Sequence, residues 1–236
     1  MLNEAQSVAL ELPFALEMLG IVIGTIGGTL VACERRLDLV GGVGLGMACG
    51  LGGGLIRDVI MQKGSVYMLD SPYGIPVAVV VSLLVFFFSS PFVRRPHVIE
   101  WLDILGVGVF AVAGCDKAML YGLSVWAALL MGILTGNGGG LLRDIMLGDV
   151  PKLFRKGNWY GICALLGAMA YWGCVVLAGV PKGPAATLGV VVTIVARRTS
   201  LRFDLQSPAE VDLTPSVKRA LGRARRAIPG KPGRRG

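Results

Sequence analysis

The sequence predicts an all-α integral membrane protein with seven transmembrane helices, arranged as two inverted three-helix repeats followed by a seventh helix. Three observations support this prediction. Charged residues make up only 16% of the 236 residues, whereas an ordinary soluble domain has roughly 25%. Several apolar segments are about 20 residues long, which is the length that crosses a bilayer core. A glycine-rich pattern that ends in Arg-Asp occurs twice, once in each half of the chain.

Hydropathy places the seven predicted spans in order along the chain, with short loops between them. They cover residues 12–32, 37–61, 74–90, 99–120, 123–147, 159–178 and 183–196. The last span is short, and it extends to residue 205 only with charged residues in its final turns. We therefore predict a first three-helix repeat, a second one, a seventh helix and a basic tail. Their bounds are residues 12–91, 98–179, 183–205 and 206–236. The tail is rich in Pro, Gly and Arg, a composition typical of disorder.

The two glycine-rich segments define how the halves of the chain correspond. The first reads GLGGGLIRD over residues 50–58, and the second reads GNGGGLLRD over residues 136–144. An offset of 86 residues aligns them, and the same offset pairs Asp103 with Glu17. Each repeat contains three spans, an odd number, so the second repeat must insert into the membrane upside down relative to the first.

Each glycine-rich segment contains a triplet of adjacent glycines. The triplets are Gly52, Gly53 and Gly54 in the first repeat, and Gly138, Gly139 and Gly140 in the second. Glycine weakens a helix by roughly 1 kcal/mol relative to alanine. Two interpretations stay open. Glycines four residues apart allow helices to pack closely, whereas consecutive glycines favour a kinked or broken helix that leaves a polar path through the membrane.

Several ionisable residues fall within the predicted spans, where an unpaired charge costs several kcal/mol. Glu17 and Asp103 either concentrate cations at the mouths of a path or accept hydrogen bonds that fix the bundle, and the two roles can coexist. Lys117 either extends to the lipid headgroups or is a gating group. As a gating group it would pair with Asp116 or with carbonyl groups freed at the glycine triplets.

An adjacent Arg-Asp pair follows each triplet, Arg57-Asp58 in the first repeat and Arg143-Asp144 in the second. Adjacent residues do not face each other on a helix, so we expect no bridge within either pair. We expect each side chain to reach the other repeat or a neighbouring loop in a structural role. Binding of lipid phosphate by the arginines, or an electrostatic barrier, are the alternatives.

Composition argues against several other classes of protein. The five cysteines and the single histidine form neither a disulfide framework nor a metal-binding pattern,. We identify no catalytic residues, so we do not expect an enzyme. Most of the net charge of +8 lies beyond Val195, where aromatic residues do not interleave with the basic ones, so we expect no nucleic-acid partner. A basic tail after a last membrane helix is typical of the cytoplasmic side or of contact with anionic lipid.

Lys and Arg are unevenly distributed among the loops. Arg35, Arg36, Arg155 and Lys156 fall on one predicted side together with the tail, and the opposite side holds fewer basic residues. By the positive-inside rule this asymmetry favours an outside N-terminus and a cytoplasmic C-terminus. The sequence therefore predicts a multi-pass protein of the plasma membrane.

The doubled glycine motif resembles the prokaryotic branch of the trimeric intracellular cation channels, also described as a bacterial family with paired glycine-transporter domains. An acidic-x-x-Gly start to each repeat, at Glu17 and Asp103, and the segment GCDKA over residues 114–118 support the resemblance, which covers residues 12–200. The chain departs from the bacterial pattern at Glu17, where aspartate is usual. The lysine-rich lipid-binding signature of the animal members is not evident.

The resemblance implies a homotrimer in which every subunit holds its own pore, with the second and fifth spans kinked at their glycines around it. It also implies permeation by the monovalent cations K⁺ and Na⁺, with no further cofactor. Asn137, which replaces Leu51 of the first copy, could offer an oxygen to a passing cation. A lipid is a candidate bound ligand. The alternative function is a secondary transporter of a small solute such as glycine, because inverted repeats and broken helices are common in transporters.

Overall fold

The computed structural model of the protein describes residues 2–93 and 95–206, and within these ranges every regular element is a helix. The helices are α1 (Leu2–Glu34), α2 (Leu39–Met61), α3 (Tyr67–Asp70), α4 (Gly74–Phe87), α5 (Ser90–Val93), α6 (Pro96–Leu120), α7 (Val125–Met146), α8 (Gly161–Val176) and α9 (Lys182–Arg202). The all-α prediction is confirmed for this part of the chain. The predicted tail, residues 206–236, lies outside the described residues apart from Gln206.

Apart from α3 and α5, each helix lies at one of the predicted spans. α3 and α5 have four residues each, and so short a run does not display the helical period in the sequence. α9 continues to Arg202. It therefore extends beyond residue 196, where the shorter prediction for the seventh span ended, and includes the charged turns that follow.

Within residues 2–93 and 95–206, length and composition single out four helices that could cross a membrane. They are α2, α7, and the apolar parts of α1 (Phe14–Glu34) and α6 (His97–Leu120). α4 and α8 are apolar but shorter. α9 has 21 residues but carries four basic side chains: Lys182, Arg197, Arg198 and Arg202.

The two glycine-rich helices begin and end in the same way at corresponding positions. The side chain of Asp38 accepts from Gly41 N–H at 2.8 Å before α2, and Ser124 accepts from Ala127 N–H before α7 at 3.4 Å. Such N-caps satisfy N–H groups that lack a partner within the helix. Beyond the helices, Gln62 has φ 47° and Gly148 has φ 72°. Both pairs of positions are related by the offset of 86, so the correspondence extends past the glycine motif.

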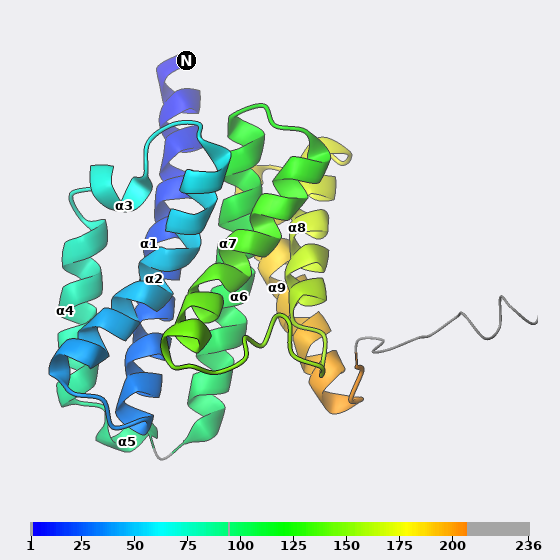
Figure 1. The fold of residues 1–236 in the computed structure, drawn as a ribbon. Helices are drawn as coiled ribbons and strands as arrows, with labels where there is room; N and C mark the ends of the chain where they lie inside the picture. The colour runs from blue at the N-terminus through cyan, green and yellow to red at the C-terminus, as the bar shows by residue number, and fades with distance from the viewer. Residues whose placement is uncertain (1, 94, 207–236) are drawn as a thin grey trace, which may run out of the picture. The chain divides into compact units, whose positions relative to one another are not determined.

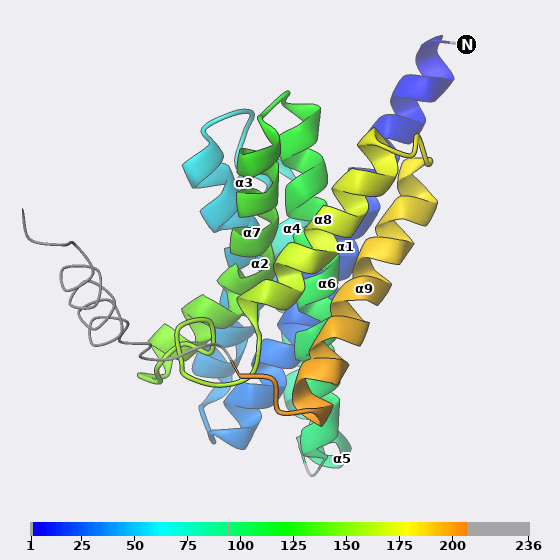
Figure 2. The ribbon, with the colours of Figure 1, turned by 90° about the vertical axis from the view of Figure 1, so that its right-hand side faces the viewer.

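α1, α2, α6 and α7 form the centre of the bundle, and α4, α8 and α9 flank it (Figure 1). α1 and α2 pack together with α4 on one side, and α6 and α7 pack together with α8 on the other. Contacts of α1 with α6 and of α2 with α7 join the two groups. α9 lies along α8 and α6 at the edge of the second group (Figure 2).

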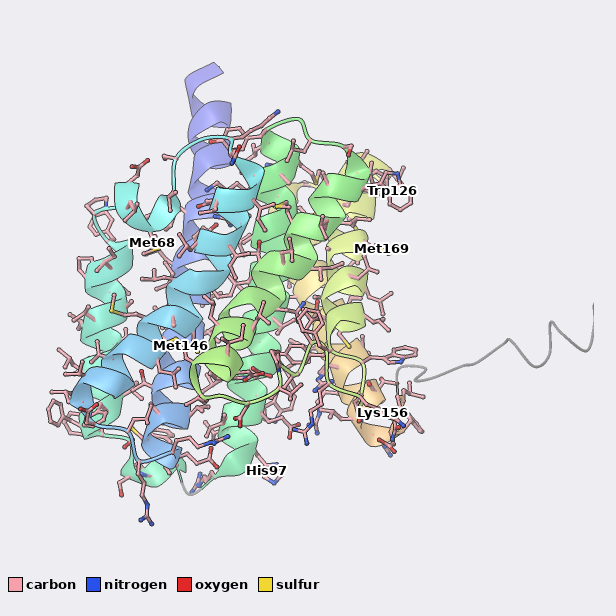
Figure 3. All side chains as sticks on the ribbon, viewed as in Figure 1. Met68, His97, Trp126, Met146, Lys156 and Met169 are labelled. Carbon is pink, nitrogen blue, oxygen red and sulfur yellow. The ribbon has the colours of Figure 1, made fainter. Side chains whose placement is uncertain are left out.

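α2 and α7 run in opposite directions through this centre (Figure 1). Figure 3 places Met68, which follows α2, toward the same end of the bundle as Trp126 at the start of α7. Met146, at the end of α7, lies toward the opposite end with His97 and Lys156. We call these the α2 end and the α7 end of the bundle, after the helix that finishes there.

Each three-helix group has its own apolar core. Ile21, Leu51 and Ala78 form the buried centre of the group of α1, α2 and α4. A larger cluster, which includes Val112 and Tyr171, joins α6 and α8 to α7 and α9. The larger cluster also includes buried residues of α1 and α2, so apolar packing continues from one group to the other.

Candidate functional site

α2 and α7 cross with their backbones in direct contact at the glycine triplets. A Cβ atom on Gly53 would collide with the carbonyl oxygen of Thr135, and one on Gly139 with the carbonyl oxygen of Cys49. A Cβ atom on Gly138 would lie 2.9 Å from the Cα of Gly53. No side chain fits between the two helices here. We call Gly53, Gly138 and Gly139 the glycine crossing.

Both triplets are helical in the structure. α2 runs from Leu39 to Met61 and α7 from Val125 to Met146 without interruption, so the expectation of broken or unwound backbone at the triplets is wrong. Tertiary packing compensates for the low helix propensity of glycine, since the missing side chains allow the close approach. A helix can bend while it keeps its hydrogen bonds, so the kinks expected at the triplets, and a pore lined by these glycines, stay predictions.

The first Arg-Asp pair belongs to a network of four charged side chains at the α2 end. Arg57 is fully buried, and its guanidinium donates through Nη1 to Glu17 and through Nε to Asp58 Oδ1, the latter at 2.7 Å. Lys117 Nζ donates to the same oxygen at 2.8 Å. The other oxygen of Asp58 accepts from Tyr67 N–H at 2.9 Å. We call Glu17, Arg57, Asp58 and Lys117 the first quartet.

A second quartet, Asp103, Arg143, Asp144 and Lys152, lies at the α7 end. Arg143 donates to Asp103 Oδ1 at 3.0 Å and to Asp144 Oδ1 at 2.9 Å. Lys152 contributes twice: its backbone N–H reaches Asp144 Oδ2 at 2.9 Å, and its ammonium lies 3.3 Å from Asp103 Oδ2. The hydroxyl of Tyr160 donates to the same oxygen of Asp103 at 3.0 Å.

These contacts correct one expectation about the Arg-Asp pairs. Arg57 bonds Asp58 and Arg143 bonds Asp144, although adjacent residues leave a helix in different directions. The guanidinium carries several donors in a rigid planar fork on a long side chain, so it reaches its neighbour and a carboxylate of another helix at once. The expected contact with a loop is present at Lys152, and Asp58 accepts from Tyr67, the first residue of the short helix α3.

Each quartet contains two carboxylates and two basic groups, so its formal charges cancel. An isolated charge in a low-dielectric interior costs several kcal/mol, and a buried arginine needs both a counter-charge and hydrogen-bond acceptors. Arg57 and Arg143 obtain these from a preceding helix and from the adjacent aspartate. The geometry is consistent with the structural role expected for the pairs, and that role stays a prediction.

Lys117 and Asp116 have different partners from those expected. Lys117 pairs with Asp58 on α2, and it bonds neither Asp116 nor a carbonyl of the triplets in the described part of the chain. Asp116 is fully buried on another face of α6, where it accepts from Tyr171 at 2.6 Å and lies 2.7 Å from Lys182 Nζ. Lys117 therefore ties α6 to α2, and Asp116 ties α6 to α8 and α9.

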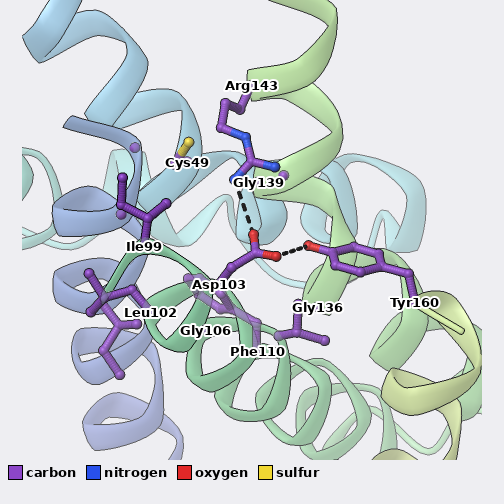
Figure 4. Close-up of a pocket in the computed structure, with 16 residues that line it drawn as sticks. Cys49, Ile99, Leu102, Asp103, Gly106, Phe110, Gly136, Gly139, Arg143 and Tyr160 are labelled. Carbon is purple, nitrogen blue, oxygen red and sulfur yellow. Dashed lines mark hydrogen bonds and ion pairs between the residues drawn. The ribbon is translucent and has the colours of Figure 1, made fainter. Parts of the chain in front are cut away.

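Small cavities adjoin both quartets. One of about 40 Å³ lies between α1, α2, α6 and α7, where Asp103, Arg143 and Tyr160 line it (Figure 4). Gly136, which precedes the second triplet, forms another part of its wall. This space is enough for a water molecule. A smaller cavity of about 10 Å³ adjoins Glu17 at the α2 end.

Asn137 is buried beside the glycine crossing with half of its amide group satisfied. Its nitrogen donates to the carbonyl of Ile133 at 2.8 Å. Its Oδ1 has no hydrogen-bond partner among the described residues. A buried acceptor without a partner is unusual, which makes this oxygen available to a water molecule or a cation.

Sequence reasoning did not identify Lys152, Tyr160 or Tyr67 as members of the site. The usable signal was position, because each aspartate of the Arg-Asp pairs accepts from a backbone N–H in the segment that follows its helix. Tyr160 has no counterpart in the first repeat, because the offset of 86 pairs it with Gly74.

The chain is similar to known bacterial membrane proteins over most of its length. The family described as "Glycine transporter" matches residues 14–90 and 100–175. The UPF0126 inner membrane protein YadS of Escherichia coli (strain K12) is 31% identical over 202 residues, which cover 84% of this chain and 95% of that protein.

Solved structures have the same fold. The TRIC trimeric intracellular cation channel orthologue from Rhodobacter sphaeroides matches with a TM-score of 0.75 and 33% identity, covering 82% of this chain and 98% of that one. A prokaryotic TRIC channel solved in 0.5 M KCl matches with a TM-score of 0.73 and 26% identity, again over 82% of this chain and 98% of the other.

Proposed function

The chain belongs to the glycine transporter family of prokaryotic TRIC-type membrane proteins, and from this membership we propose that it forms a homotrimeric channel for K⁺ and Na⁺ with one pore in each subunit. The likeness to the Rhodobacter sphaeroides cation channel, over nearly the whole of that chain, carries the proposal. The permeating ions are the only ligands that this function requires. Contacts with lipid and with two further copies of the chain are the expected interactions.

We infer that the chain crosses the plasma membrane seven times as two inverted three-helix repeats and a seventh helix, α9. Support comes from the opposite directions of α2 and α7 (Figure 1) and from the matching caps at the two ends of these helices. The excess of basic residues in alternate loops supports an outside N-terminus and a cytoplasmic C-terminus,. Relatives named as inner membrane proteins support the location.

The proposed ion path runs between α1, α2, α6 and α7, and the glycine crossing closes it. A cation would enter at one quartet, pass the crossing beside Asn137, and leave at the other. Conduction therefore requires α2 and α7 to separate or bend at Gly53 and Gly139, which would expose backbone carbonyls and the free oxygen of Asn137 to the ion. Carbonyl oxygens can replace part of the hydration shell of a cation.

The charged residues then have distinct proposed roles. Glu17 and Asp103 attract cations to the two mouths while they also hold the arginines. Lys117 is the gating group, because its bond to Asp58 joins α6 to the moving helix α2. Asp116 lies away from the glycine crossing, and its proposed role in gating is indirect: it attaches α8 and α9 to α6.

Recording from the reconstituted protein tests the proposal. We expect planar bilayers that contain the purified trimer to give discrete single-channel currents in symmetrical KCl and NaCl. A bilayer without current, together with vesicles that take up glycine in a saturable way, would contradict the channel and favour a transporter. The transporter alternative is suggested by the description of the matched family. A transporter binds its substrate at a site near the membrane midplane, so its rate of uptake saturates as the substrate concentration rises.

A further inference from the structure

Each quartet holds a lysine ammonium between a carboxylate and a tyrosine ring. Lys117 Nζ is 2.8 Å from Asp58 Oδ1 and 6.0 Å from the ring centroid of Tyr67. Lys152 Nζ is 3.3 Å from Asp103 Oδ2 and likewise 6.0 Å from the ring centroid of Tyr160. The two lysines are 35 positions apart and are not related by the offset of 86. An ammonium between a carboxylate and a tyrosine ring thus occurs at both ends from unrelated positions, although the ring of Tyr160 also has the guanidinium of Arg197 5.0 Å from its centroid.

The two ammonium groups differ in how firmly they are held. The side chain of Lys117 is 15% exposed, whereas that of Lys152 is 45% exposed. The contact of Lys152 is also longer, by the distances above. Its backbone N–H is bonded to Asp144, so the side chain can swing into solvent while its attachment point stays in place. Lys152 is therefore the charge that a free cation could replace.

We propose that Asp103 and Tyr160 form a binding site for a monovalent cation, which the ammonium of Lys152 occupies as a tethered substitute. The choice of ligand rests on the proposed function. A free cation would meet Asp103 Oδ2, the phenolic oxygen of Tyr160 and the face of its ring, all of which attract positive charge. The adjoining cavity of about 40 Å³ supplies space for a water molecule of its hydration shell,.

Charge balance gives the reason for the exchange. Among the four members of the second quartet the charges cancel with Lys152 in place, and displacing its ammonium leaves one net negative charge on them. Arg197, which lies over the ring of Tyr160, bonds backbone carbonyls and not a carboxylate of the quartet. One monovalent cation restores neutrality, whereas a divalent cation would leave an excess of positive charge. Lys152 and a free cation consequently compete for Asp103, and the lysine lowers occupancy of this mouth when few cations are present.

Thermal melting of the purified full-length protein tests the site without any measurement of current. The melts compare KCl with N-methyl-D-glucamine chloride at constant ionic strength. In K152Q we expect K⁺ to raise Tm by about 2–4 °C at about five times its Kd, through binding to the folded state alone. The wild type should respond less, because its own ammonium fills the site. Lys156→Gln is the matched control, since Lys156 lies in the same loop and pairs with no carboxylate among the described residues.

Two further variants make the outcome decisive. K152R keeps the tethered charge and should return the weak response of the wild type, whereas adding D103N to K152Q should abolish the K⁺ effect. The proposed site would be refuted if K152Q had the same Tm in both salts. It would also be refuted if K⁺ still raised the Tm of the double variant. If the double variant does not fold, Tyr160→Phe in K152Q replaces it, and an undiminished K⁺ effect there counts against the proposal. A protein that carries no current but shows these shifts would refute the channel and keep the site.

Discussion

At the scale of single residues, Arg57 and Arg143 impose the strictest demands on the fold. Each is buried in the protein and bonds two carboxylates, one on the adjacent residue and one on the first helix of its own group. Removing one partner of a buried charge pair leaves an uncompensated charge, which costs about 3–5 kcal/mol. We therefore expect the arginines to require the carboxylates of Glu17 and Asp103, whatever else these carboxylates do for ions.

Replacing Arg57 with lysine tests this demand. Lysine keeps the positive charge but lacks the planar fork that reaches both carboxylates, so we expect Arg57→Lys to lower the free energy of unfolding by about 2–4 kcal/mol. The measurement is chemical denaturation of the purified protein in detergent. Arg35→Lys is the control, because the pair of Arg35 with Asp149 is half exposed and such pairs contribute about 0–1 kcal/mol. Equal stability of the two variants would show that the buried arginine acts as a simple point charge.

Lys117 gives the residue-scale prediction about gating. In Lys117→Met, Asp58 keeps Arg57 and the N–H of Tyr67, so the quartet persists while α6 loses its ion pair with α2. A loss of about 1 kcal/mol from the closed state should raise the open probability about fivefold, as recorded in single-channel traces. Lys63→Met, an exposed lysine beyond α2, should leave it unchanged. An unaltered open probability in Lys117→Met would show that Lys117 takes no part in gating and that its ion pair only holds α6 against α2.

The sequence was sufficient to find most of the charged residues but not their partners. Glu17, Asp103 and the Arg-Asp pairs stand out because charge is rare in apolar segments. The contact within each pair was missed because the spacing rule compares the directions of side chains and takes no account of the reach of arginine. Tyr160 and Lys152 were missed because they lie in a loop, and their proximity to Asp103 depends on how that loop returns to the bundle.

At the scale of elements, the α2–α7 pair shows why a glycine triplet need not break a helix. The low propensity of glycine suggested broken helices, but propensity is a weak prior that tertiary packing overrides. Here the packing is backbone against backbone, with the carbonyls of Thr135 and Cys49 where side chains would be. The sequence marked the triplets as unusual positions and left two interpretations open, and the structure shows a close contact between two backbones there.

Alanine substitutions separate the crossing from other glycines on the same helices. Alanine favours a helix by roughly 1 kcal/mol over glycine, and at Gly44, where a Cβ meets nothing within 4 Å, we expect Gly44→Ala to stabilise the protein and leave the K⁺ current intact. At Gly139 a Cβ collides with a backbone carbonyl, so Gly139→Ala should cost about 1–3 kcal/mol and reduce the current, with trimers retained on native gels. Currents of wild-type size in Gly139→Ala would exclude the crossing from the ion path.

At the scale of the whole molecule, the repeat made much of the fold predictable. The offset of 86 relates the glycine motifs, the caps at Asp38 and Ser124, and the left-handed residues Gln62 and Gly148. What the sequence could not supply is the attachment of α9, which has no partner in the repeat. Its end is held by bonds from Arg197 to the carbonyl of Trp159 and from Trp159 N–H to Ser200, contacts between segments with no shared pattern.

Orientation in the membrane is the prediction that concerns the molecule as a whole. Ser65 and Ser90 are both exposed and lie on either side of α4, so a chain that crosses the membrane through α4 places them on opposite faces. Basic residues favour the cytoplasm on the side that holds Arg35 and Lys156,, and this is the predicted side of Ser90. In a background that lacks the partly exposed Cys33 and Cys174, an impermeant maleimide should label Ser65→Cys in intact cells and Ser90→Cys only after permeabilisation. The reverse pattern would invert the topology and place the Lys152 mouth outside the cell, where Na⁺ rather than K⁺ would be its main competitor.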